Sequence, residues 1–313
     1  LDWREAREAA ISLIDRGIAS RRGRYFYPTP DILANIITRR TLQTCDRSQF
    51  LELLSKLSED TQNSFADRIR QIGVSDDAKS LASDLMEEGF FFHSISDLNH
   101  SRVSNSLRLL TGAFPELAAN KLESVILGAE EDELAKLKDG RRQVVWALEE
   151  LVWWEDSFAK AARSLLRLAV FENEDYGNNA TGVWQNMFQI MLGGSTTPFP
   201  KRLSLLKNAL ADADARVRSI AVGGLNSALK TQQIVGSIMP PTDTGRLPPE
   251  DWHPSTYREW AELIKELLPL LESAVKDQNY SVRAIALSVL KDRASDMINI
   301  GLAEEWISLV EGL

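Results

Sequence analysis

Two stretches of this chain, DADARVRSIAVGGL at residues 212–225 and DQNYSVRAIALSVL at residues 277–290, match each other without a gap at a shift of 65 residues. In both, apolar residues recur at steps of three and one, the spacing that lines one face of an α-helix. Another apolar run precedes each stretch, at 203–210 and at 268–275. The sequence therefore predicts repeated units of two helices, each with an apolar stripe that needs neighbouring units to bury it.

The same pattern extends outward from these two units, in weaker form. Apolar spacing at 158–169, after an expected helix at 141–153, predicts a third and less regular unit. Residues 45–140 also carry helical spacing, and we expect them to form irregular helical repeats. Residues 231–256 hold five of the eleven prolines, which exclude a continuous helix and predict a loop inserted between helices.

Small residues recur on the apolar stripes of the two matched units, at Ala221, Gly224 and Ala286. A side chain no larger than a methyl group lets a second helix approach closely, so we expect tight helix contacts there. Asp212 or Asp214 is placed to cap the helix that follows, because a carboxylate oxygen accepts from the free N–H groups of a first turn.

The two matched stretches resemble HEAT repeats, which are marked by an aspartate followed by Val-Arg and then by small and apolar residues. The resemblance implies an all-α fold, a HEAT-like α-α superhelix over residues 141–313 with an extended concave surface. It also implies a ladder of acids and arginines between successive repeats, formed by Asp212, Arg218, Asp277 and Arg283. Exposed pairs contribute about 0.2 to 1 kcal/mol each, so we expect this ladder mainly to align the repeats.

Residues 1–44 have a different pattern. An amphipathic helix is followed by YFY at 25–27, which favours a short strand, and by Pro30, which suits the first turn of a new helix. The order resembles the end of a winged-helix module. The pattern Y-x-T-P-x-x-L-A at 27–34 is similar to one in large bacterial STAND-class NTPases, where a winged helix links the ATPase core to a helical-repeat sensor. We therefore expect residues 1–44 to be a small winged-helix-like remnant.

Two further stretches, at 176–206 and 247–260, resemble the helical C-terminal regions of bacterial ATP-binding proteins linked with antiphage defence. No G-x-x-x-x-G-K-[ST] phosphate-binding pattern occurs in the 313 residues. The chain begins at Leu1 without an initiator methionine, which suggests a piece of a longer polypeptide. We expect no cofactor in this chain, and ATP and Mg²⁺ to belong, if anywhere, to an upstream NTPase domain.

Composition narrows the class of protein. The formal net charge of −9 opposes broad attraction to phosphate backbones. No apolar run reaches the roughly 18 residues that a membrane span needs, and the N-terminus lacks the apolar core of a signal peptide, so we expect a cytoplasmic chain with no membrane partner. The single cysteine, Cys45, cannot form an internal disulfide, and the three histidines are too dispersed to predict a metal site.

The segment YGNNATG at 176–182 is the strongest candidate binding site. Asparagine amides and nearby aromatic faces could contact a ligand, and the residues that would do so are Tyr176, Asn178, Asn179, Thr181 and Trp184. The alternative interpretation is a turn between helices, in which Asn and Gly adopt left-handed backbone angles and Thr181 caps the next helix. No catalytic set of residues is predicted, because the adjacent acidic pairs lack an orienting partner.

A second candidate site is basic. Arg21, Arg22 and Arg24 stand beside the aromatic residues 25–27, a composition that suits contact with a phosphate backbone and stacking on bases. The same residues also suit a hairpin that docks on an acidic protein domain. We therefore expect a non-catalytic protein-recognition scaffold or sensor region of a larger bacterial NTPase, binding a protein or peptide, with a nucleic-acid-binding HEAT-repeat protein as the alternative.

Overall fold

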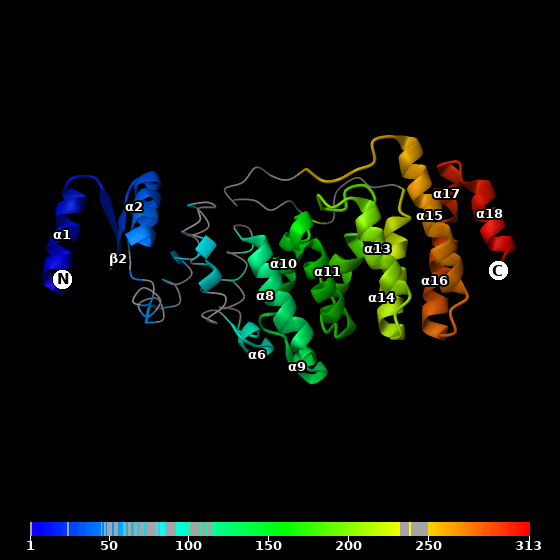
Figure 1. Ribbon diagram of the computed structural model, residues 1–313, viewed down its shortest axis with the longest axis horizontal. Helices are drawn as coiled ribbons and strands as arrows, with labels where there is room; N and C mark the ends of the chain where they lie inside the picture. Colours follow the sequence, from blue (N-terminus) through cyan, green and yellow to red (C-terminus); the bar gives the residue numbers. More distant parts are fainter. Residues whose placement is uncertain are drawn as a thin grey trace.

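The structure, a computed structural model, is mostly helical. It describes residues 2–23, 25–44, 92–100, 114–231 and 250–313, together with Ile238 and isolated positions between 46 and 111. The helices follow one another in a row, with the N-terminal elements at one end and the last helices at the other (Figure 1). The all-α prediction is therefore confirmed at this level. None of the described helices combines the length and the apolar character needed to cross a membrane.

The N-terminal unit is a helix, a hairpin and a second helix: α1 (Trp3–Asp15), β1 (Ala19–Arg22), β2 (Tyr25–Pro28) and α2 (Asp31–Thr44). The strands are antiparallel, with Arg21 opposite Phe26 and Arg22 opposite Tyr25. Gly23 turns the chain between them with a φ of +61°, a region that favours glycine. The predicted strand at 25–27 is thus confirmed, and the following helix begins directly after Pro30.

Most of the stretch expected to form irregular repeats, from 45 to 113, lies outside the described residues, and so does Cys45. Its described part contains α6 (Ile95–Leu98), α8 (Pro115–Gly128) and α9 (Glu131–Lys136). Pro115 opens α8, where the missing N–H of proline costs no helical hydrogen bond.

Helices stack in pairs through the C-terminal half. The elements are α10 (Arg141–Leu151), α11 (Glu155–Val170), α12 (Ala180–Asn186), α13 (Phe199–Leu210), α14 (Ala215–Ala228), α15 (Tyr257–Val275), α16 (Tyr280–Asp292), α17 (Ala294–Asn299) and α18 (Ala303–Glu311). Helix α11 packs on α8 and α10, α14 packs on α13 and α16, and α15 packs on α16 and α18. The short helix α12 packs against both α11 and α14.

The predicted repeat is present in the helix boundaries. Helices α13 and α15 end 65 residues apart, at Leu210 and Val275, and α14 and α16 begin 65 residues apart. The caps correspond as well, because Asp214 caps α14 and Asn279 caps α16. In the predicted Pro-rich loop, residues 232–237 and 239–249 lie outside the described residues, and the described part from 250 to 256 contains no helix.

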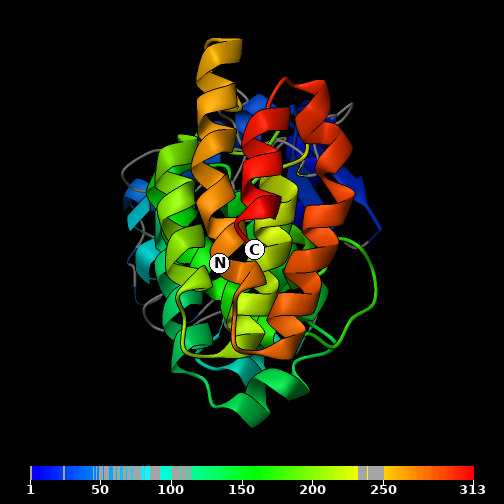
Figure 2. The same cartoon turned by 90° about the vertical axis from the view of Figure 1, so that its right-hand side faces the viewer.

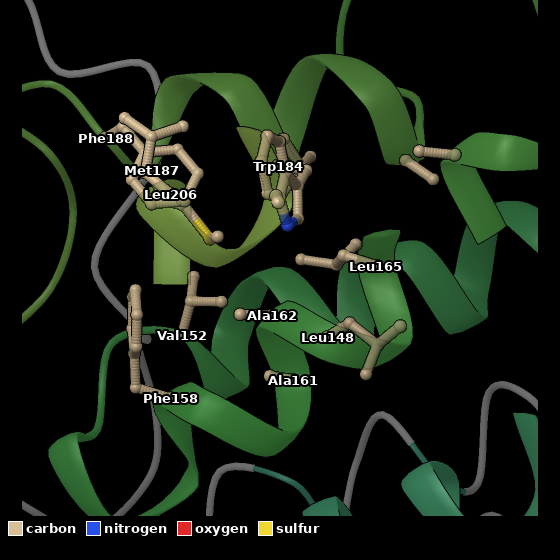
Figure 3. Close-up of a cluster of buried hydrophobic side chains, with 14 of the residues drawn as sticks. Leu148, Val152, Phe158, Ala161, Ala162, Leu165, Trp184, Met187, Phe188 and Leu206 are labelled. Atoms are coloured by element: carbon tan, nitrogen blue, oxygen red, sulfur yellow. The ribbon is translucent and has the colours of Figure 1, made fainter. Parts of the chain in front are cut away.

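A continuous apolar core runs between the stacked helices (Figure 3). Trp184 of α12 lies at its centre, edge-on to Phe188 at 4.6 Å between ring centres. Gly224 of α14 permits this contact, because a β-carbon there would lie only 3.0 to 3.1 Å from atoms of Phe188, Leu206 and Trp184. The expected close approach at Gly224 is therefore confirmed, and it places α12 directly on α14.

Candidate functional site

The turn between α11 and α12 contains most of the predicted binding residues. Asn179 caps α12: its Oδ1 accepts from the N–H of Gly182 at 2.8 Å, and its Nδ2 donates to the carbonyl of Glu174 at 2.7 Å. Asn179, and not Thr181, therefore caps the helix. Both polar ends of the Asn179 amide are used inside the turn, which leaves that side chain little to offer a ligand.

Thr181 is bound by the acid Glu172. The N–H of Thr181 lies 3.0 Å from Glu172 Oε2, and its hydroxyl lies 3.3 Å from the same oxygen. The other carboxylate oxygen of Glu172 accepts from Nε of Arg141 at 3.2 Å. Arg141 is fully buried and also donates to the carbonyl of Leu168 at 2.7 Å. Because a buried charge without a partner is strongly destabilising, the role of Glu172 here is structural.

Tyr176 lies at the edge of this network. Its hydroxyl donates to Glu174, and the guanidinium of Arg142 lies 4.7 Å from its ring centre. Burial, and secondly the hydrogen bond to Glu174, raise the pKa of Tyr176 to about 12. The phenol is therefore protonated at neutral pH and is no general base. Arg142 also lies 5.9 Å from the ring centre of Trp146, so a cation joins two aromatic rings there.

The two remaining predicted binding residues, Asn178 and Trp184, lie in different environments. Asn178 is exposed in the turn. Trp184 is 1% exposed and packs in the core, so the expectation that it presents its ring to a ligand beside Tyr176 does not fit the structure. The reason is helical geometry, because Trp184 follows the buried residue Ala180 by four positions and shares its face. The segment is thus a turn between helices, but the left-handed backbone angles expected for its Asn and Gly residues are wrong, because no residue from 176 to 182 has a positive φ.

The expected ladder of acids and arginines has one rung in the structure. Arg218 donates to both carboxylate oxygens of Asp277, from Nε at 2.7 Å and from Nη2 at 3.2 Å. The side chains of Arg218 and Asp277 are only 18% and 13% exposed. Asp212 accepts from the backbone N–H of Asp214 instead. Arg283 donates to the carbonyl of Asp277 at 2.9 Å and forms no ion pair within the described part of the chain. The ion pair between Arg218 and Asp277 is thus less exposed than the sequence suggested.

The basic residues of the hairpin do not form one patch. Arg21 shares a face with its cross-strand neighbour Phe26 and lies 5.6 Å from that ring, whereas Arg22 shares the opposite face with Tyr25. Successive residues of a strand point to opposite faces, which divides the two arginines. Arg21 is also held by the carbonyl of Gly23 at 2.8 Å. Arg24 lies outside the described residues.

Sequence reasoning missed Arg202, a fully buried arginine in the first turns of α13. Its Nη1 donates to the carbonyls of Met187 and Gln189 at 2.8 and 2.9 Å, which fixes the chain after α12. Burial lowers the pKa of Arg202 to about 10, and the charge of Asp251 partly opposes this effect. A signal was present in the sequence, because Arg202 precedes Leu206 by four residues and so lies on the apolar stripe.

Helix α2 carries three exposed isoleucine side chains. Ile32 and Ile36, one helical turn apart, are 73% and 58% exposed, and Ile37 beside them is also exposed. Within residues 2–44 as described, only Ala34 and Leu42 are buried apolar side chains. Isolated exposed apolar residues are ordinary on a protein surface, but a contiguous group on one helix indicates a contact surface.

The possible metal ligands are dispersed in the part of the chain that the structure describes. In the described ranges, no three His, Cys, Asp or Glu side chains are placed together to hold a metal ion. A comparison with models of known protein families finds no match, and a search of curated proteins finds none that is significantly similar. The helical stack and its surfaces are therefore the basis for inferring a function.

Proposed function

We propose that this chain is a HEAT-type helical-repeat scaffold that recognises a protein or peptide and catalyses no reaction itself. The observation that carries the proposal is the uncovered apolar face of α2, formed by Ile32, Ile36 and Ile37. Burying such a face stabilises a complex by about 25 cal/mol for each Å² of apolar surface removed from water, which favours a protein partner over a small polar ligand.

The resemblance of the sequence to STAND-class NTPases extends this proposal. An upstream NTPase domain of the same polypeptide would cover α2, with the winged-helix-like unit as the connection between them. The helical row would then act as the sensor region of a cytoplasmic bacterial protein of antiviral defence, and ATP and Mg²⁺ would belong to the upstream domain. Helix α2 lies near the N-terminal end of the row, next to α1, and this position supports the arrangement (Figure 1).

The test is a substitution on α2 with a matched control. The polypeptide is expressed with its native upstream sequence, and its bound proteins are identified by crosslinking and mass spectrometry. We expect Ile32→Glu with Ile36→Glu to lose crosslinks between α2 and an ATP-binding domain, while Leu127→Glu on α8, 42% exposed in the wild type, keeps them. Unchanged crosslinks in the α2 variant, or an upstream sequence without a P-loop, would contradict the NTPase arrangement.

A second candidate function, nucleic-acid binding, is favoured by one face of the hairpin. Arg22, Tyr25 and Tyr27 lie on the same face and are all exposed, so a base could stack on a tyrosine beside a cation. If a nucleic acid binds there, Arg22→Glu should abolish salt-sensitive retention on single-stranded DNA or RNA, and Arg21→Glu on the opposite face should have a smaller effect. Equal retention of the wild type, Arg22→Glu and Arg21→Glu proteins counts against this function.

A further inference from the structure

Helices α14 and α16 are equivalent by the 65-residue shift, so Arg283 corresponds to Arg218. One guanidinium nitrogen has an equivalent contact in both: Nη1 of Arg218 donates to the carbonyl of Asp212 at 2.8 Å, and Nη1 of Arg283 donates to that of Asp277 at 2.9 Å. Nη1 of Arg218 also donates to the carbonyl of Ala213 at 2.9 Å. The other two nitrogens differ. In Arg218, Nε and Nη2 bind the carboxylate of Asp277, whereas in Arg283 they meet no carboxylate within the described residues.

The helix surface around each arginine differs in the same way. Arg218, Val222 and Asn226 follow one another at four-residue steps, and the first and last contact the next unit, through Asp277 and Arg293. Val222 lies between them and is fully buried. Its equivalent on α16 is Leu287, which is 46% exposed. The face of α16 that carries Arg283 and Leu287 therefore corresponds to a face of α14 that the next unit covers. On α16 this face is exposed.

This face lies at the C-terminal end of the row. The view onto that end shows α16 and α18 at the front of the molecule (Figure 2). Helix α18 packs on α15 and α17, and Trp306 and Leu309 of α18 are buried. We call the surface of α16 formed by Arg283 and Leu287 the end face.

We propose that the end face binds a helical hairpin of a partner protein, whose inter-helix turn presents an aspartate to Arg283 and whose second helix covers Leu287. The chain itself provides the template, because the turn between α15 and α16 presents Asp277 to Arg218 in this manner. The proposal rests on the proposed protein-recognition function and names the chemistry of one partner. A second copy of the chain could not use its own Asp277, which Arg218 already occupies.

The template also provides the probe. A synthetic peptide copying residues 277–292, crosslinked on its solvent side to keep it helical, is titrated into the full chain by fluorescence anisotropy. We expect saturable binding in the micromolar range. Because a charge-assisted bidentate pair is lost, Arg283→Gln in the chain, or Asp277→Asn in the peptide, should each weaken binding roughly tenfold. Both changes together should weaken it little further, since they remove the same contact.

Controls separate folding from binding. Leu287→Glu changes an exposed residue, so the variant should keep its circular dichroism spectrum and lose the peptide, and Leu127→Glu should keep both. Absence of saturable binding below about 1 mM would overturn the proposal, and so would wild-type affinity in either the Arg283→Gln or the Leu287→Glu chain. A dimer of the chain that Leu287→Glu abolishes would overturn it in favour of a second copy. None of these outcomes depends on α2, whose substitutions test the proposed function separately.

Discussion

At the scale of single residues, the pair Arg218–Asp277 connects two repeats. The contact joins residues 59 positions apart and uses both carboxylate oxygens, so it fixes distance and orientation together. The hydrogen bond from Arg218 is the largest cause that lowers the pKa of Asp277. Since both side chains are mostly buried, we expect this pair to contribute more to the free energy of unfolding than an exposed ion pair does.

The shifted pKa gives a prediction with a definite sign. A carboxyl group whose pKa is lower in the folded state stabilises the fold above its unfolded pKa, near 4, and loses that effect as the pH falls through the folded value. Arg218→Gln should lower the melting temperature by about 2 to 6 °C at pH 7, corresponding to about 1 to 2 kcal/mol. The difference from wild type should shrink as the pH falls below about 4, as followed by circular dichroism. A constant difference would mean that the charge of Asp277 is not involved.

At the scale of elements, the short helix α12 packs against both α11 and α14, and two glycines allow close contacts around it. A β-carbon on Gly182 would lie 2.0 Å from the carbonyl oxygen of Gly177, in the turn that carries Glu174 and Asn179. A β-carbon on Gly223 of α14 would meet only the end of the Gln185 side chain, also at 2.0 Å. The two glycines therefore restrict the helix contact for different reasons.

This difference predicts effects of different size for the same substitution. Gly182→Ala should destabilise the protein by at least about 2 kcal/mol, because backbone must move. Gly223→Ala should remain within about 1 kcal/mol of wild type, because Gln185 can rotate away and alanine is the better helix former by up to about 1 kcal/mol. Urea unfolding of both variants measures this. Similar losses in the two would show that Gln185 is as rigid as the turn.

At the scale of the whole molecule, buried apolar side chains are distributed unevenly along the row. Helices α11, α12 and α14 carry many fully buried residues, whereas the described N-terminal unit buries only Ala34 and Leu42. Local stability follows the density of buried contacts, so the two ends of the row should not open with equal free energies.

Hydrogen–deuterium exchange should reveal that gradient. In the isolated chain we expect amides of α1, β1, β2 and α2 to exchange far faster than those of α11 and α14, because less buried surface must be exposed to open them. Addition of a protein that covers Ile32 and Ile36 should slow exchange in α2. Equal protection of α2 and α11 in the isolated chain would mean that α2 is already covered, for example by a second copy.

The sequence by itself determined what depends on neighbours along the chain. Helix pairs at 203–225 and 268–290, their common shift, and the strand at 25–27 follow from local spacing and turn chemistry, and all are present in the structure. Part of the candidate turn was predictable in the same way, because Asn and Gly near a helix start indicate a cap and a turn.

Only the tertiary structure decided which side chains are covered. Trp184 belongs to the core because α12 packs on α14, and Glu172 is structural because Arg141, 31 residues earlier, is buried against it. Val222 and Leu287 occupy equivalent positions in equivalent helices, yet one is buried and the other exposed. Burial depends on which other parts of the chain pack against a residue. Leu287 lies on a helix near the C-terminal end of the row (Figure 1) and is left exposed.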